Sequence, residues 1–293
     1  MERELWKSLY QLACELDNSW KQGRHLRYDA AIIVGVYLWA VLHDRPTSWA
    51  CDPGNWAGVT PPDPLPPQPR MSVRLRSPSV QALWEAIDRE MVAACQAAAV
   101  WLMIIDAKPL PVGAYSKDRD ARLGFVARGK WARGYKLHVI WNAGAYPLAW
   151  EVTGLNESET NVAKRLIQRV HQEGYLLGDK MFDGNELFDM AGALGLQLVS
   201  PKRRPGSYQY RRQSPYRMRA RDILSSEFGK ALYEERDQIE RHFGQLTNFG
   251  GGLAPLPNWV RRPHRVRMWI HAKLIVNARR TQLRQQADMQ AAA

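Results

Sequence analysis

A fully apolar run that ends in a carboxylate constrains this chain more than any other feature of its sequence. The run extends from Val100 to Asp106 and contains no polar residue before the aspartate. Continuous apolar runs of this kind are typical of a central strand that is buried on both faces of an α/β sheet. We therefore expect Val100–Asp106 to be a central strand, with Asp106 at its end.

Alternating strand and helix patterns follow this run. We expect a hairpin in which Tyr135–Trp141 and Pro147–Val152 are joined by a turn at Asn142–Ala145. The later predicted elements are a helix at Ser158–Glu173, a strand at Tyr175–Asp179, a helix at Asp183–Leu194, a strand at Gln197–Ser200, and helices at Ser225–Leu246 and Arg265–Gln285. This order indicates an α/β domain with a mixed sheet flanked by helices.

The sequence before residue 95 has a different pattern. Ala30–Leu42 is apolar nearly all round, as in a helix buried inside a bundle. The prolines between residues 52 and 70 cannot continue a helix, whereas Ser79–Ala99 again has helical spacing. We expect an all-helical N-terminal domain at 1–95 with a proline-rich linker at 52–70, an α/β domain at 96–285 and a tail at 286–293.

The charge balance points to the class of partner. The chain has 41 Lys+Arg against 29 Asp+Glu, which gives a net charge of +12 and favours a polyanionic partner. Its longest apolar run, Ala30–Leu42, is shorter than the about 20 residues of a membrane helix, so we expect no membrane association. The N-terminus shows no secretory signal, and three scattered cysteines exclude a disulfide framework, so we expect a cytoplasmic protein.

Two aspartates follow strands whose ends should meet. Asp106 and Asp179 each end a predicted strand, and the carboxyl ends of neighbouring strands in open α/β sheets converge on one crevice. Two close carboxylates repel each other, and a divalent cation such as Mg²⁺ or Mn²⁺ relieves this repulsion. The alternative is that each aspartate only caps the turn that follows it.

The late predicted helix adds a third acid. At helical spacing Tyr233, Arg236 and Glu240 line up beside an apolar stripe, so Glu240 lies at the edge of the buried face. From there a glutamate reaches a metal at the sheet edge, and an arginine one turn earlier reaches a phosphate. The alternative is ordinary surface charge.

With these motifs in place, the chain resembles the DDE transposases of bacterial insertion sequences, whose catalytic domain has the ribonuclease-H-like fold. Ile104–Pro111 resembles the family's first-aspartate strand, and Gly134–His138 its second strand. Leu177–Asp183 is similar to the second-aspartate segment, often written Asp-Lys-Gly-Tyr-Asp, with Met181 in place of the usual Gly. Tyr233–Glu240 is similar to the subgroup signature Tyr-Arg-Glu-Lys, whose lysine position holds Thr247.

The resemblance implies an activity, cofactors and partners. Asp106, Asp179 and Glu240 would be the catalytic acids and the ligands of two Mg²⁺ or Mn²⁺ ions, and would support DNA strand cleavage followed by strand transfer. Tyr233 and Arg236 would hold a phosphate of the DNA. The implied partner is double-stranded DNA, both transposon ends and target, bound by a homodimer, and the implied location is the cytoplasmic nucleoid.

A basic, tyrosine-containing segment from Lys202 to Arg221 is the main candidate for further DNA contacts. We expect phosphate contacts from Lys180, next to Asp179, and from the segment residues Lys202, Arg203, Arg204, Arg211, Arg212, Arg217 and Arg219. A solvated loop is the alternative for this segment. The helices before residue 95 suit either DNA-end recognition or dimerisation. Two other functions stay open: a ribonuclease-H-like nuclease that is not tied to transposition, and a domesticated DNA-binding protein without catalytic activity.

Overall fold

Two compact units make up the chain. The computed structural model describes residues 2–17, 27–96, 101–113, 115–127, 130–203, 213–248, 253 and 255–292. The first unit comprises Met1–Ala94, Asn248–Gly252 and Met268–Ala293, and the second comprises Cys95–Thr247 and Leu253–Arg267. The division expected from the sequence placed the whole last helix with the sheet, whereas its residues from Met268 onward group with the N-terminal helices.

The first unit is helical. It contains α1 (Glu2–Leu16), α2 (Ala30–Leu42), α3 (Thr47–Ala50), the 3-10 turn η2 (Pro53–Asn55), α4 (Gln68–Arg74), most of α5 (Pro78–Gln96) and most of α11 (Pro263–Ala292). Every residue of α2 is buried, and Asp29 caps the helix by accepting a 2.8 Å hydrogen bond from the Ile32 amide. Lys273 of α11 pairs with Asp44 at 2.6 Å, so a buried ammonium joins α11 to the end of α2.

The second unit is built on a mixed sheet with six strands among the described residues. They are β1 (Leu102–Pro111), β2 (Arg122–Ala127), β3 (Lys130–Trp141), β4 (Ala149–Gly154), β5 (Gly174–Leu177) and β6 (Leu196–Val199). β1 pairs in parallel with β5, and β5 with β6, whereas the β1–β3, β2–β3 and β3–β4 pairs are antiparallel. Both β4 and β1 pair with β3, which gives the order β4-β3-β1-β5-β6, and β2 pairs with the first part of β3. The expected ribonuclease-H-like mixed sheet is confirmed.

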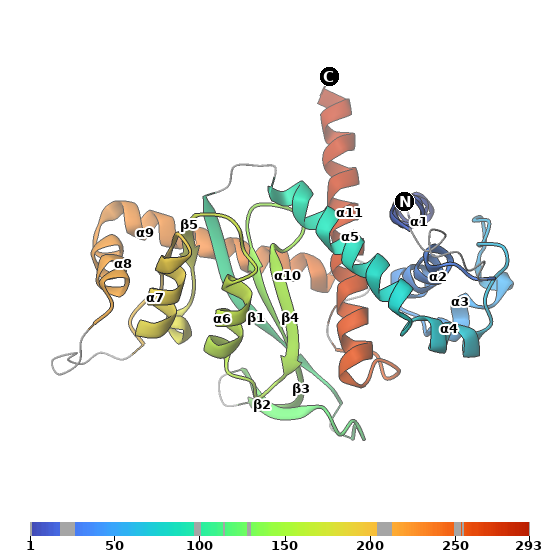
Figure 1. The fold of residues 1–293 in the computed structure, drawn as a ribbon, viewed down its shortest axis with the longest axis horizontal. Coiled ribbons are helices and arrows are strands. Elements are labelled where there is room, and N and C mark those ends of the chain that lie inside the picture. The colour runs from blue at the N-terminus through green and yellow to red at the C-terminus, as the bar shows by residue number, and fades with distance from the viewer. Residues whose placement is uncertain are drawn as a thin grey trace. The chain divides into compact units, whose positions relative to one another are not determined.

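Helices cover both faces of this sheet. They are α6 (Glu159–Ile167), α7 (Asn185–Ala193), α8 (Pro215–Ser225), α9 (Glu227–Glu234) and α10 (Gln238–Asn248), with 3-10 turns η3 (Lys180–Phe182) and η4 (Glu235–Asp237). In Figure 1, α6 lies in front of the strands and α10 behind them. His242 of α10 stacks on Trp141, and Trp141 lies opposite Ile104 in the β1–β3 register. Because side chains alternate along a strand, α10 covers the face that also carries Asp106.

β1 is longer than expected. The apolar run predicted a strand that ends at Asp106, but β1 continues to Pro111 with two prolines in it. Its parallel pairing with β5 extends only from Leu102 to Ile104, so beyond Ile104 the strand is hydrogen-bonded to β3 alone. Prolines are tolerated on such an edge, because no partner there needs their missing amide hydrogen. Asp106 therefore lies in mid-strand, just past the point where β5 stops pairing.

Other elements of the second unit also differ from expectation. β2 and α8 were not predicted, and the continuous helix expected at Ser225–Leu246 consists of α9, η4 and α10. The hairpin at Asn142–Ala145 is confirmed, with Asn142 Oδ1 accepting a 2.8 Å bond from the Gly144 amide. Within the described part of the chain, no helix combines the length and apolar character that a membrane crossing requires.

Candidate active site

Asp106 occupies the middle of the sheet. Its Oδ1 accepts a 2.7 Å hydrogen bond from the Ala107 amide, and it lies opposite Val139 of β3. Burial is the main cause that raises its pKa, to about 6, and the charges of Asp179 and Glu159 add to this rise. The Ala107 hydrogen bond and the Arg236 charge act in the opposite direction. The surroundings of Asp106 therefore disfavour its ionised form.

Asp179 directly follows β5 and caps the turn η3. Its Oδ1 accepts a 2.8 Å hydrogen bond from the Met181 amide, as the capping alternative anticipated. Burial raises its pKa, and the Glu159 charge adds to the rise against the Met181 hydrogen bond and the charges of Arg236 and Lys180. The neighbouring parallel strands β1 and β5 thus bring the two aspartates into electrostatic contact.

Two side chains of the late helical region reach this pair. Arg236 of η4 lies 3.5 Å from Asp106 Oδ2, and its charge also acts on Asp179. Tyr233 of α9 donates a 3.2 Å hydrogen bond to the carbonyl of Gly178, directly before Asp179. Burial raises the pKa of Tyr233, which therefore stays a neutral hydrogen-bond donor. Three motifs far apart in the sequence meet at one place.

The structure does not bring Glu240 to the two aspartates. Glu240 is exposed on α10, and the described residues contain no group of three His, Cys, Asp or Glu side chains that could hold a metal ion. The expectation that Tyr233, Arg236 and Glu240 share one helical line is wrong, because the 3-10 turn η4, which contains Arg236, lies between Tyr233 of α9 and Glu240 of α10. A 3-10 turn advances about 120° per residue instead of about 100°, so a uniform helical projection fails across it.

Buried side chains hold α10 in this orientation. Ile239 and Phe243 are buried, and His242 stacks on Trp141 with ring centroids 4.5 Å apart and planes 12° apart. Burial lowers the pKa of His242 to about 4, so the ring is neutral at pH 7. These contacts fix which face of α10 meets the sheet and leave Glu240 on another face.

Glu159 is an acid near the aspartates that the sequence analysis missed. It lies in the first turn of α6, and its charge raises the pKa of both Asp106 and Asp179. Lys136 of β3 holds it with a 2.7 Å ion pair between Nζ and Oε1. Lys136 could have indicated such an acid, because it is a cation in the mainly apolar strand Tyr135–Trp141, and a buried cation needs an acidic partner.

The donor set at this site suits a hard divalent cation. Asp106 and Asp179 supply carboxylate oxygens, and burial together with neighbouring acids raises the pKa of both groups, so their ionised forms need a further positive charge. Mg²⁺ and Mn²⁺ prefer such oxygen ligands and favour the ionised form of both groups. The residues present therefore fit the expected type of cofactor.

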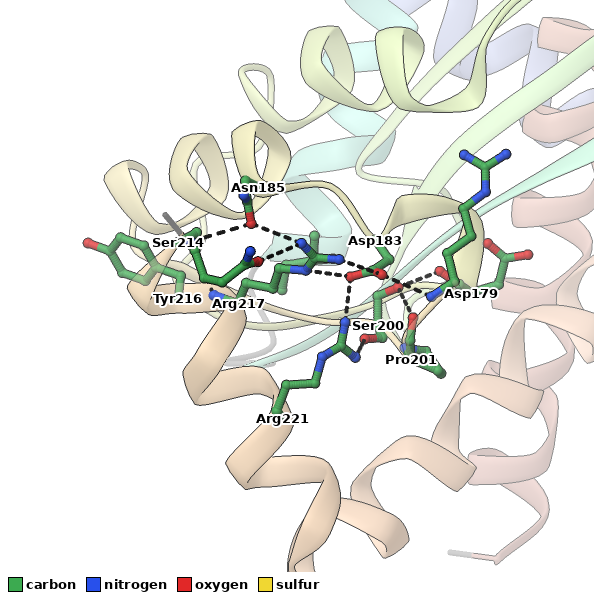
Figure 2. Close-up of polar contacts among 12 residues, drawn as sticks. Asp179, Asp183, Asn185, Ser200, Pro201, Ser214, Tyr216, Arg217 and Arg221 are labelled. Atoms are coloured by element: carbon green, nitrogen blue, oxygen red, sulfur yellow. Dashed lines mark hydrogen bonds and ion pairs between the residues drawn. The ribbon is translucent and has the colours of Figure 1, made fainter. Parts of the chain in front are cut away.

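A buried ion-pair network lies next to Asp179 (Figure 2). Asp183, whose side chain is 2% exposed, accepts two hydrogen bonds from Arg217 at 2.7 and 2.8 Å and one from Arg221. Arg217 was expected to contact DNA, but it is buried and its guanidinium also bonds Asn185 and Gln213. Its position in α8 explains the difference, since α8 packs against β6 and α7 and turns Arg217 toward Asp183.

The other expected DNA contacts have varied positions. Lys180, Arg203 and Arg219 are exposed, and Lys202 is half-buried. Arg204, Arg211 and Arg212 lie outside the described residues. The Thr247 hydroxyl, at the signature's lysine position, donates a 2.7 Å bond to the Phe243 carbonyl one turn earlier.

Sequence comparison decides the family. Residues 101–276, more than half of the chain, match the family described as "Transposase DDE domain". The chain belongs to the DDE transposase family. The region matched by this transposase family spans Asp106, Asp179, Tyr233, Arg236 and Glu240.

Structural comparison gives a distant similarity to another transposase. The chain is similar to the piggyBac transposase in a cryo-EM structure of its synaptic complex with hairpin DNA, with a TM-score of 0.39 and 11% sequence identity. The similarity covers 71% of this chain and 52% of that one, so this chain spans about half the length of that transposase. No curated protein matches this DDE transposase family member.

Proposed function

We propose that the protein is a transposase of an insertion-sequence element that cleaves DNA strands and joins the freed ends to a target. The main support for this proposal is that Asp106, Asp179 and Arg236 lie together where the pairing between β1 and β5 ends. Membership of the DDE transposase family supports the reaction class. The Tyr-Arg-Glu-Lys subgroup stays a prediction.

Each side chain has a proposed role. Asp106 and Asp179 would hold the divalent ions, two Mg²⁺ or Mn²⁺, with Glu240 as the third acid. When bound, such ions activate a water or a DNA 3′-hydroxyl and stabilise the leaving oxygen of an in-line displacement. Arg236 would offset part of the charge of Asp106 and would bind a phosphate, and Tyr233 would orient the backbone at Gly178.

DNA is the proposed partner. The net charge of +12 attracts a polyanion, and exposed Lys180, Arg203 and Arg219 lie in the same unit as the two aspartates. Assembly as a homodimer on DNA and a location at the nucleoid stay predictions.

Charge-removing variants test the catalytic role. Asp106→Asn and Asp179→Asn keep the side-chain volume, so each should abolish Mg²⁺-dependent cleavage of transposon-end DNA while end binding is largely kept. Glu234→Gln, on an exposed position of α9, is the matched control and should cleave as the wild type does. An Asp106→Asn or Asp179→Asn chain with wild-type cleavage would remove that residue from the site.

The third acid is tested in the same assay. If Glu240→Gln loses cleavage and Glu159→Gln keeps it, α10 must move to bring Glu240 to the aspartates during the reaction. The reverse result would assign the role to Glu159. Cleavage without strand transfer in the wild type would indicate a nuclease outside transposition, and end binding without cleavage would indicate a non-catalytic DNA-binding protein.

A further inference from the structure

The hairpin of β2 and β3 exposes aromatic side chains that no part of the proposed reaction uses. Phe125 of β2 and Trp131 of β3 lie directly opposite each other, with ring centroids 6.1 Å apart and planes at 78°. They are 52% and 67% exposed, and Leu123 beside them is 59% exposed. Single exposed apolar residues are common, but three on one hairpin face form a surface that needs an explanation.

The two faces of this hairpin have different surroundings. A Cβ atom at Gly124 would lie 2.5 Å from the carbonyl oxygen of Leu155, so the face that carries Gly124 packs closely on the chain after β4. Because side chains alternate, Leu123, Phe125 and Trp131 project from the opposite face, and Arg133 pairs with Leu123 on that face. The exposed aromatic face is thus a consequence of how the hairpin is anchored.

The positive charge of the hairpin indicates which class of partner binds this face. The sequence from Ala121 to Tyr135 contains no acidic residue. Arg133 is an exposed cation on the face of Leu123, Phe125 and Trp131, and Arg122 and Lys130 are exposed cations that alternate to the other face of the hairpin. A second copy of this basic surface would repel it, whereas a nucleic acid brings phosphates for the cations and flat bases for the rings.

We propose that the β2–β3 hairpin binds DNA, with Phe125 and Trp131 stacking on bases that are unpaired and with Lys130 and Arg133 contacting the adjoining phosphates. Bases in an intact duplex are covered by their neighbours, so stacking requires a frayed or opened end. This inference rests on the proposed function, because strand cleavage and joining require DNA ends at the protein.

A binding assay on the full chain tests the hairpin separately from cleavage. The probes are a forked DNA with an unpaired end and a fully paired duplex of the same sequence, measured by fluorescence anisotropy without divalent ions. The double variant Phe125→Thr/Trp131→Thr keeps residues that favour strands. We expect it to lose about tenfold in affinity for the fork and less than about twofold for the duplex.

The chain offers a matched control. Trp101 and Phe228 are 52% and 56% exposed and both pack edge-on against Tyr175, at the start of β5, away from Asp179. The variant Trp101→Thr/Phe228→Thr removes the same two ring types and should bind both probes as the wild type does. Equal losses in the two double variants would overturn the proposal.

Two further results decide what the hairpin contacts. Lys130→Gln/Arg133→Gln leaves the rings in place and should flatten the dependence of fork affinity on salt. If Phe125→Thr/Trp131→Thr binds the fork as tightly as the wild type does, DNA is not the partner of this face. The same conclusion holds if that variant keeps its fork affinity but loses a self-association that the wild type shows. An equal loss for fork and duplex would overturn base stacking.

One more variant tests the catalytic proposal separately from the hairpin proposal. Asp106→Asn with the hairpin intact should bind the fork as the wild type does. If this variant still cleaves DNA, the catalytic assignment of Asp106 fails while the result for the hairpin stands.

Discussion

The substitution Asp183→Asn removes one negative charge from the buried ion-pair network that Figure 2 draws. The side chain keeps its size, and one oxygen still accepts a hydrogen bond. Two guanidinium groups, those of Arg217 and Arg221, lose their shared counter-charge, and their own side chains are only 10% and 20% exposed. We expect a large loss of stability for this reason.

The magnitude follows from burial. Breaking a buried ion pair by removing one partner costs about 3–5 kcal/mol, because the other charge stays buried without compensation. The Arg262–Asp120 pair, at 52% and 38% exposure, is the control in the same unit. Asp120→Asn should cost less than about 1 kcal/mol, since water already solvates both groups.

Urea denaturation is the suitable assay, because urea does not screen charges as guanidinium salts do. Burial opposes the ionisation of Asp183, but hydrogen bonds from Arg217 and Arg203 and the charges of Arg221 and Arg217 hold its pKa below the usual range. A lowered pKa stabilises the fold above the ordinary aspartate pKa of about 3.9, and this contribution disappears as the pH falls through the folded-state pKa.

The difference between wild type and Asp183→Asn should therefore be full at pH 7 and should shrink below about pH 4. A loss at pH 7 no larger than that of Asp120→Asn would refute the reasoning. So would a difference that grows on acidification.

Three other predictions concern the site and its DNA contacts. Arg236→Ala removes the cation beside Asp106, so the pKa of Asp106 should rise above about 6 in a carboxyl NMR titration. Arg219→Gln should reduce the slope of log K against log salt for DNA binding by about 0.9 if Arg219 contacts a phosphate, whereas Arg217→Gln should mainly lower the urea midpoint. Thr247→Lys should tighten end binding by no more than about 1 kcal/mol, and unchanged binding would show that position 247 does not face DNA.

The sequence predicted the centre of the sheet because local pattern and tertiary environment agree there. Met103, Ile104 and Ile105 are buried, so β1 is covered on both faces where the apolar run predicted it, and the Asn142–Ala145 turn has its own side-chain hydrogen bond. Arg122–Ala127 was missed because four of its residues are exposed and Gly124 interrupts the strand pattern. Its place in the sheet depends on pairing with β3 and not on its own residues.

Residues of the site that depend on distant partners were not predictable in the same way. Asp106 and Asp179 were found because both lie just past the paired part of two neighbouring parallel strands, a position that depends on the sheet and not on the loops. The position of Glu240 depends on η4, and the helical pattern gives no sign of a 3-10 turn there. Arg217 was assigned to DNA because its partner Asp183 is 34 residues away in the sequence and is brought to it only by the packing of α8.

The two aspartates are held in different ways, and this difference has a consequence for substitutions. Asp106 lies within the β1–β3 ladder, whose pairing continues both before and after it along β1. Asp179 lies past the end of β5, where its carbonyl accepts a 2.6 Å hydrogen bond from the Ser200 hydroxyl, and the Ser200 carbonyl in turn accepts a 2.9 Å bond from Arg221. Because Arg221 also pairs with Asp183, the position of Asp179 depends on the same network that stabilises α8 against the sheet. Changes in that network should therefore affect the geometry of Asp179 while Asp106 stays in place.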